Sequence, residues 1–478
     1  MSQPKRLVRP KALVAAVGTI AAAALVLTGC SAGSSSDDKV TITLAGPNQF
    51  TDQTNTFGPA WDKLITQFEK DNPNITIKTN VLPLSSFGTT LSTQLTAGTA
   101  PELIFNQPAP KPDQVMNLDK YLAEKNPFDP NSKTWLDGFD KNYFGDAQRD
   151  GTGHHTWVPF NLVTVGIFYN NDILKKEGIS PSQLSTFDGF TKACTTLKEA
   201  GIDPLATDKG TLATMWATTA IQSTMLDPLA DKINVFGGDG NAGTANPLAT
   251  KSLAKGILDG SLDVSTDPAI ADSVKIIKKW YDACATPNWS GIPAAGAFTG
   301  STAFPGGKAA MAWGTNFSAA GLSTVKFDWS TVPFPTISTK DSKYASGAPA
   351  SFGTGAGGTS YMIPAYIKGA KLDAAIKFLQ YVSSPKIENW LAETGSIPAI
   401  TSAKAPTTIE ALTSKDWSAP AKMSNGALLT PAAQTGQNLL TGYLIGSKTL
   451  DEYLAAQQAS NVTWAHEQVT NNKWTDVG

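Results

Sequence analysis

Strand-like and helix-like segments alternate between residues 40 and 105, and this alternation limits the fold more than any other feature of the chain. The pattern of apolar residues predicts strands at 40–45, 74–81 and 103–105, and helices at 58–71 and 87–97. A β-α-β-α-β order predicts a parallel sheet, because right-handed crossovers return each strand alongside an earlier one. The loops that follow the strands then meet at one edge of that sheet.

The chain is too long for a single core. It has 478 residues, 41% apolar and 16% charged, a composition that excludes a coiled coil, a collagen and wholesale disorder. Residues 157–170 (WVPFNLVTVGIFYN) are extended and lack a turn signal after Pro159, as a segment that runs from one lobe into another would be. Further helices are predicted around residues 187–200, 212–225, 268–284 and 372–382. We therefore expect two α/β lobes.

The first 39 residues have the pattern of an export signal and an anchor. An apolar run of 16 residues at 12–27 is shorter than the roughly 20 that cross a bilayer, and basic residues precede it: Lys5, Arg6, Arg9 and Lys11. We interpret residues 1–29 as a signal peptide. The sequence LTGC at 27–30 resembles the lipobox of bacterial lipoproteins, which implies a lipid on Cys30. The alternative is ordinary cleavage beside an unrelated cysteine.

After the signal, residues 30–39 would be the lipidated cysteine and a flexible, polar tether. The body of the chain would then be held at the outer face of the cell membrane by its lipid. Four of the 38 Lys and Arg leave with the signal, so 34 remain against 40 Asp and Glu, and the net charge becomes −6. Because nucleic-acid partners require a basic face, we expect no nucleic acid to bind.

Two cysteines remain in the exported part. Cys194 and Cys284 each lie on the apolar stripe of a predicted helix. In an oxidising compartment they can pair as a disulfide. Two separately buried thiols are an equal alternative, because the sequence does not give the distance between them.

The sequence offers little for catalysis. It has three histidines, and His154 and His155 are adjacent, so their side chains would point to opposite faces of an extended strand. The H-E-x-x-H and G-x-S-x-G motifs are absent, and a G-x-G-x-x-G match at 238–243 is best interpreted as a loop because Pro247 follows it. We expect no enzyme, no metal site and no cofactor. A glycoside hydrolase stays open, because paired carboxylates leave no spacing signature.

Several short motifs follow one another in the order found in family 1 extracellular solute-binding proteins. They are FEKDNPNI at 68–75, LTAGTAPEL at 95–103, PF at 159–160, FYNND at 168–172, FPGGKAAM at 304–311, AAIKFLQY at 374–381 and IPA at 397–399. None of them is specific alone. Their common order from about residue 40 to about residue 464, together with the lipobox, makes the chain resemble this family.

The resemblance implies an α/β, two-lobed periplasmic-binding-protein-like fold of type II. Each lobe would be a mixed, mostly parallel sheet flanked by helices, with a hinged ligand cleft between the lobes. Residues 40–161 and 360–412 would form lobe 1, and residues 162–359 and 413–478 would form lobe 2. Such proteins capture substrates for ATP-binding cassette importers, most often mono- or oligosaccharides. The resemblance thus implies a monomer that binds a carbohydrate, closes around it and meets the permease subunits; a partner ATPase supplies the energy.

A sugar site needs planar polar groups that donate and accept hydrogen bonds, and aromatic faces that stack on the ring. Loops where the family binds its ligand carry such amides in the first lobe: Asn48, Gln49, Asn106 and Gln107. Candidates in the second lobe are Trp216, Trp313, Asn316, Phe317 and Gln434. Phe317 takes the place of a tryptophan common in relatives, and phenylalanine stacks but cannot donate. The alternative is that the amides are solvated loop residues and the aromatic residues are core.

Three other functions are open at this point. The chain could bind a non-sugar polar solute, be a secreted glycoside hydrolase, or be an adhesin or sensory module. A hydrolase would release new reducing ends from an oligosaccharide, whereas a binding protein returns its ligand unchanged. An adhesin or sensor would need no permease.

Overall fold

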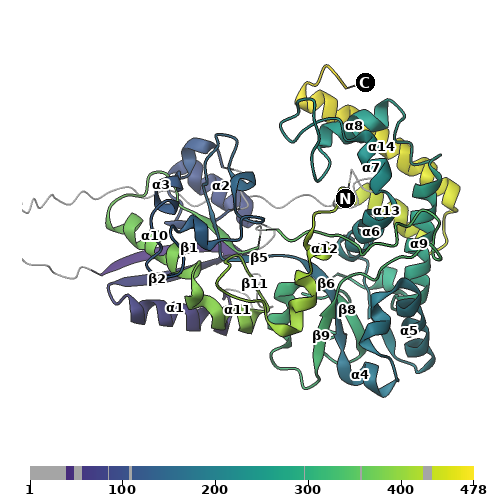
Figure 1. Cartoon of the computed structure of the whole chain (residues 1–478), viewed down its shortest axis with the longest axis horizontal. Coiled ribbons are helices and arrows are strands. Elements are labelled where there is room, and N and C mark those ends of the chain that lie inside the picture. Colours follow the sequence, from purple (N-terminus) through teal and green to yellow (C-terminus); the bar gives the residue numbers. More distant parts are fainter. Residues whose placement is uncertain are drawn as a thin grey trace, which may run out of the picture. The chain divides into compact units, whose positions relative to one another are not determined.

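The computed structural model describes residues 39–47, 56–83, 86–106, 110–294, 297–355, 358–423 and 433–477. Within these ranges the chain forms one sheet of five strands, one of four strands and one two-stranded pair, with helices packed on the two larger sheets (Figure 1). Each of these two sheets has its own cluster of buried apolar side chains. We call the five-stranded sheet with its helices the first lobe and the four-stranded sheet with its helices the second lobe.

The sheet of the first lobe is mixed and has the strand order β2-β1-β3-β10-β4. Its strands are β1 (Val40–Pro47), β2 (Ile75–Leu82), β3 (Leu103–Phe105), β4 (Val158–Pro159) and β10 (Ser360–Met362). β1 pairs in parallel with both β2 and β3, which confirms the parallel start predicted from the alternation. β10, which follows the strands of the second lobe in the chain, pairs antiparallel with both β3 and β4.

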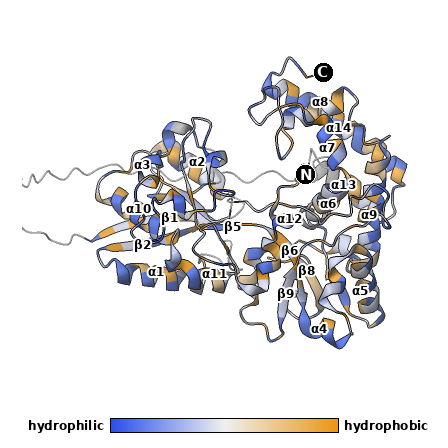
Figure 2. Ribbon diagram, viewed as in Figure 1, coloured by the Kyte–Doolittle hydropathy of each residue, from blue (hydrophilic) through white to orange (hydrophobic). Residues whose placement is uncertain are grey.

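Helix α1 (Pro59–Asp71) shows how the first lobe is packed. It starts with a proline after Gly58, whose φ is 89°, and it buries Trp61, Leu64 and Phe68. Phe68 meets Phe378 of α10 edge to face, with 5.0 Å between ring centroids. The other helices of this lobe are α2 (Phe87–Ala97), α3 (Asp119–Leu122), α10 (Ala370–Val382) and α11 (Glu388–Thr394). Figure 2 shows hydrophilic residues along α1, as expected for a helix with one face in solvent.

The sheet of the second lobe has the order β7-β8-β6-β9. Its strands are β6 (Val165–Asn170), β7 (Asp203–Ala206), β8 (Ala309–Thr315) and β9 (Trp329–Val332). β7 and β8 are parallel, whereas β6 pairs antiparallel with β8 and β9. Residues 157–170, predicted as one extended stretch, form β4, β5 (Asn161–Leu162) and β6. The stretch is broken because the chain leaves one sheet there and joins the other.

A disulfide joins two helices of the second lobe. Cys194 of α5 and Cys284 of α9 are bonded, with 5.1 Å between their Cα atoms, so the paired alternative is the correct one. Nearby, Phe190 packs on Trp280 with 4.4 Å between ring centroids. The helices of this lobe are α4 (Asn171–Lys176), α5 (Phe187–Glu199), α6 (Thr211–Met225), α7 (Asp227–Ile233), α8 (Thr250–Leu258), α9 (Pro268–Cys284), α12 (Lys415–Ser418), α13 (Ala433–Leu444) and α14 (Leu450–Asn472). Within the described ranges, every helix is too short or too polar to cross a bilayer.

Two stretches of chain that run from one sheet to the other are bonded to each other. The first passage (residues 160–164) leads from β4 to β6, and the second passage (residues 333–359) leads from β9 to β10. The Val163 and Gly355 backbones exchange N–H···O bonds of 2.8 and 2.9 Å. β5 in the first passage also pairs with β11 (Ile397–Pro398). The lobe boundaries at 161/162, 359/360 and 412/413 stay a prediction.

Candidate functional site

The candidate site begins at the carboxyl ends of the first-lobe strands. β1 ends at Pro47 and β3 at Phe105, and because the two strands are parallel their carboxyl ends lie at one edge of the sheet. Asn106 follows β3 directly; it is half-buried, and its backbone N–H donates to Ser360 O at 3.1 Å. Its side chain is thus placed at this edge by the end of a buried strand. Asn48, Gln49 and Gln107 lie outside the described residues.

The second lobe has a corresponding edge where the parallel strands β7 and β8 end. Asp208 lies between β7 and α6, and its buried carboxylate accepts hydrogen bonds from Gly210 N and Gly300 N, both at 2.7 Å. The carboxylate thereby ties the loop before α6 to the loop before β8. Gly300 has a φ of +66°, and a side chain there would come within 2.7 Å of the Ala206 Cβ. Asp208 was not predicted as a site residue, although an acidic residue shortly after a buried strand can indicate one.

Two of the predicted tryptophans lie against each other in the second lobe. Trp216 of α6 and Trp313 of β8 have ring centroids 6.1 Å apart. Trp313 is 2% exposed, and its other neighbour Phe334 stacks on it with centroids 6.2 Å apart. Trp216 is half-buried. Trp216 is therefore the member of the pair with surface left to meet a ligand ring.

Asn316 and Phe317 open the short 3-10 helix η6 (Asn316–Leu322) that follows β8. Asn316 has no exposed surface, and its carboxamide bonds the backbone of Leu162, Thr164 and Gly395. Phe317 is 5% exposed and belongs to the apolar cluster of the first lobe. Both side chains are thus covered in this structure, and whether either contacts a ligand stays a prediction. The side chain of Gln434 and all of Cys30 lie outside what the structure describes.

The family model described as "Bacterial extracellular solute-binding protein" matches residues 51–389, well over half of the chain. The chain belongs to this family. The predicted family and the predicted two-lobed α/β fold are both confirmed.

Curated relatives of this solute-binding protein match it over part of their length. An uncharacterized ABC transporter extracellular-binding protein from Pyrococcus horikoshii is 30% identical over 35% of this chain and 37% of its own. The melibiose/raffinose/stachyose-binding protein of Bacillus subtilis is 28% identical over 40% of each chain. This chain therefore spans about two fifths of the length of the curated relatives it matches.

Solved structures show the same fold over nearly the whole chain. A solute-binding protein in complex with raffinose has 18% identity and a TM-score of 0.60, over 89% of this chain and 100% of the other. Its identity is too low to carry more than the fold. The type II architecture of this solute-binding protein is thereby established.

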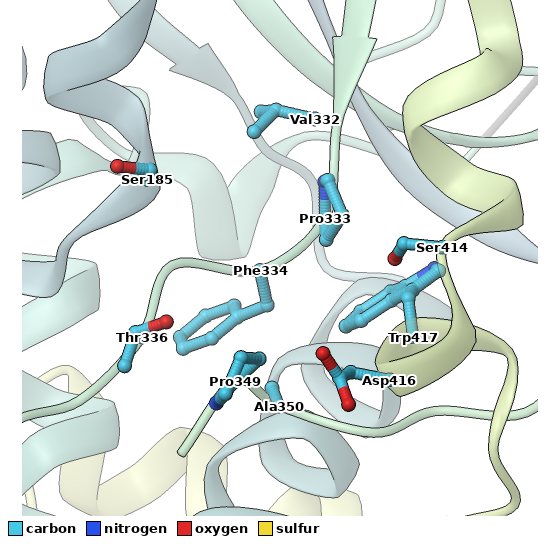
Figure 3. A pocket seen from close by; sticks show the side chains of 10 residues that line it. All are labelled: Ser185, Val332, Pro333, Phe334, Thr336, Pro349, Ala350, Ser414, Asp416 and Trp417. Atoms are coloured by element: carbon cyan, nitrogen blue, oxygen red, sulfur yellow. The ribbon is translucent and has the colours of Figure 1, made fainter. Parts of the chain in front are cut away.

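A pocket of about 200 Å³ is lined in part by Phe334, the ring that stacks on Trp313 (Figure 3). Its lining includes the buried rings of Phe334 and Trp417 and the exposed residue Asp416. The indole N–H of Trp417 donates to Val165 O at 2.9 Å, which fixes that ring beside the start of β6. The pocket contains none of the predicted ligand contacts, so it adds no support to their placement.

One histidine pair differs from its prediction. His154 and His155 do not point to opposite faces of a strand, because they lie in an irregular segment: their Nδ1 atoms are 2.8 and 3.2 Å from the same carboxylate, that of Asp119. Burial raises the pKa of Asp119, but the hydrogen bonds from both histidines and the charge of Arg149 lower it below its ordinary value. Among the described residues, no group of three or more His, Cys, Asp or Glu could hold a metal ion.

Proposed function

We propose that this protein captures a carbohydrate outside the cytoplasm and delivers it to the permease of an ATP-binding cassette importer. The observation that carries the proposal concerns one edge of each large sheet. There the carboxyl ends of parallel strands are followed by a side chain suited to bind a sugar, Asn106 in the first lobe and Trp216 in the second. A two-lobed solute-binding fold uses such edges to bind its ligand.

Carbohydrate is the substrate class that the relatives favour. Their names state melibiose, raffinose and stachyose for the Bacillus subtilis protein, and raffinose for the solved complex. Amide and aromatic side chains suit an uncharged ligand with many hydroxyls and C–H faces. Mono- and oligosaccharides are both compatible with this chemistry.

The proposed contacts are those predicted from the sequence. Trp216 offers an exposed part of its ring, and Asn106 offers a half-buried carboxamide. The further contacts that we propose are Asn48, Gln49, Gln107, Trp313, Phe317 and Gln434. Asn316 was predicted as a contact too, but its buried carboxamide is bonded to backbone, so we do not propose it as a contact. A ligand touched from both lobes favours the closed form, because it shifts the population only by its extra affinity for that form.

The anchor and the location are part of the same proposal. The basic and apolar segments at 1–29 and the lipobox at 27–30 support export, lipidation of Cys30 and a position at the outer face of the membrane. The partner permease and ATPase supply the membrane path and the energy. The chain itself acts as a monomer without a cofactor.

A thermal-unfolding panel tests the proposal. Residues 31–478 are heated with a series of mono- and oligosaccharides, since binding to the folded state alone raises the melting temperature by mass action. We expect a saturable shift with one sugar class, and recovery of that sugar intact. New reducing ends would instead identify a glycoside hydrolase. No shift with any sugar would contradict the carbohydrate assignment and favour another polar solute.

A further inference from the structure

The side chain of Asn316 is fully used by the protein itself. Its Oδ1 accepts from Thr164 N at 3.0 Å, and its Nδ2 donates to Leu162 O at 3.2 Å and to Gly395 O at 3.3 Å. The backbone N–H of Asn316 also donates to Thr164 O at 3.0 Å. With no exposed surface, this residue is a buried polar group whose donors and acceptors are all satisfied by backbone.

These bonds join parts of the chain that belong to different sheets. Asn316 follows β8 of the second lobe, whereas Gly395 lies between α11 and β11, which pairs with β5. Leu162 and Thr164 lie in the first passage. The Thr164 hydroxyl in turn donates to Gly353 O at 3.1 Å, so the second passage is tied to the same point. One carboxamide therefore connects the second-lobe sheet, the first passage and the end of α11.

The backbone around Asn316 has little room to move. Gly395 has a φ of +64°, and a Cβ at this position would overlap the Cβ of Ala319 and lie 2.8 Å from Asn316 O. The positive φ and the closeness of η6 together require glycine at this position. Hinge motions are absorbed by residues that can change φ and ψ. A closely packed residue whose hydrogen bonds are all made changes these angles least.

We propose that Asn316 is the pivot of the lobe motion: its carboxamide stays bonded to Leu162, Thr164 and Gly395 in open and closed forms, and the passages bend around it. The inference rests on the hinge closure of the proposed function. It gives Asn316 a positioning role, which differs from the direct ligand contact predicted for it.

The test measures a distance between the lobes without any ligand. Spin labels are attached at Lys63→Cys on α1 and Lys176→Cys on α4, whose lysine side chains are 68% and 77% exposed. In residues 31–478 the two native cysteines are bonded to each other, so only the new ones react. Pulsed electron resonance then gives the distribution of interlobe distances. We expect Asn316→Ala to broaden this distribution about twofold, because the pivot is lost.

Asn126→Ala is the matched control. Asn126 is 1% exposed, and its carboxamide also bonds backbone groups, those of Phe128, Gln380 and Ser383, but all of them lie in the first lobe. We expect its melting temperature to fall by an amount comparable to that of Asn316→Ala, with an unchanged distance distribution. Equal broadening in both variants would overturn the proposal, since it would show a general loss of stability.

A milder variant keeps the test valid if Asn316→Ala does not fold. Thr164→Val removes only the bond to Gly353 O, and we expect a smaller broadening in the same direction. An unchanged distribution in every variant that folds would overturn the pivot. If the distribution stays narrow in Asn316→Ala while the sugar-induced melting shift disappears, Asn316 is a ligand contact instead. A broad distribution in a protein that no sugar stabilises would support the pivot and count against the carbohydrate assignment alone.

Discussion

The two lobes are stabilised in different ways. In the first lobe, Trp61 lies at the centre of an aromatic group, with the rings of Phe57, Phe378 and Trp390 at 5.4 to 6.3 Å. The second lobe has a covalent link as well, between Cys194 and Cys284, and Cys30 is the only other cysteine of the sequence. A hinged binding protein needs each lobe to move as a rigid body. The comparison teaches that both lobes have aromatic packing, and that the second lobe adds a cross-link to it.

The largest expected effect is a loss of stability in the first lobe. Trp61 is 1% exposed and its indole N–H donates to Thr79 Oγ1 at 2.8 Å. Trp61→Ala should lower the free energy of unfolding by about 3–5 kcal/mol, because it leaves a cavity in the core. Hydrogen exchange read by mass spectrometry should show the loss of protection in the first lobe. Trp61→Phe, the control, should lose less, and equal loss of protection in both lobes would contradict independent stabilisation.

The second effect concerns the cross-link. Replacing both Cys194 and Cys284 by Ala opens a loop with a sequence separation of 90 and should lower the free energy of unfolding by about 2–4 kcal/mol. Protection should fall in α5 and α9 while α1 and α10 keep theirs. Chemical denaturation with hydrogen exchange measures both quantities. Loss of protection that is uniform over the two lobes would show that the lobes do not differ as described.

The third prediction concerns the second lobe as a ligand-binding surface. Trp216→Ala should weaken sugar binding by about 1–3 kcal/mol, because ring stacking and apolar contact are lost. Trp464→Ala is the control, since Trp464 is also half-buried and lies on α14, which packs on α8 and α13. Titration calorimetry gives both dissociation constants. An unchanged value for Trp216→Ala would remove this ring from the site.

The smallest effect is a pH dependence confined to the first lobe. Because the pKa of Asp119 is lowered from its ordinary value of 3.8, its contribution to stability is complete above that value and is lost as the pH falls through the lower pKa of the folded chain. Melting temperatures between pH 5 and pH 2 should therefore fall more steeply for the wild-type protein than for Asp119→Asn. Parallel curves would show that the charged Asp119 carboxylate, with its bonds to the histidines and its interaction with Arg149, contributes nothing to stability.

Local patterns in the sequence predicted the helices and strands well, whereas contacts between distant residues could not be predicted from them. The alternation at residues 40–105 is a local property, and β1, α1, β2, α2 and β3 appear where it predicts them. Cys194 and Cys284 were placed correctly on two helices, but their pairing depends on how those helices pack. Asn316 shows the limit most clearly, because its bonds reach backbone 152 and 79 residues away. The sequence does not distinguish an asparagine whose amide is exposed from one whose amide is buried and bonded within the protein.

Trp313 illustrates the same limit for aromatic side chains. A strand directs successive side chains to opposite faces, and the sequence does not show that both faces of β8 are covered, so that all its residues but Thr315 are buried. In the structure Trp313 packs between Trp216 and Phe334, so the exposed ring surface belongs to Trp216 on a different element. The candidate site could thus be predicted as a region of the fold, while the individual contacts could not.

The most direct test of the central claim is small-angle X-ray scattering of residues 31–478 with and without the sugar that raises the melting temperature. We expect the radius of gyration to fall when the sugar saturates the protein, and the sugar to be recovered unchanged. This result would show a binding protein that closes on a carbohydrate. Saturating sugar with an unchanged radius of gyration, or hydrolysis of the sugar, would contradict the account.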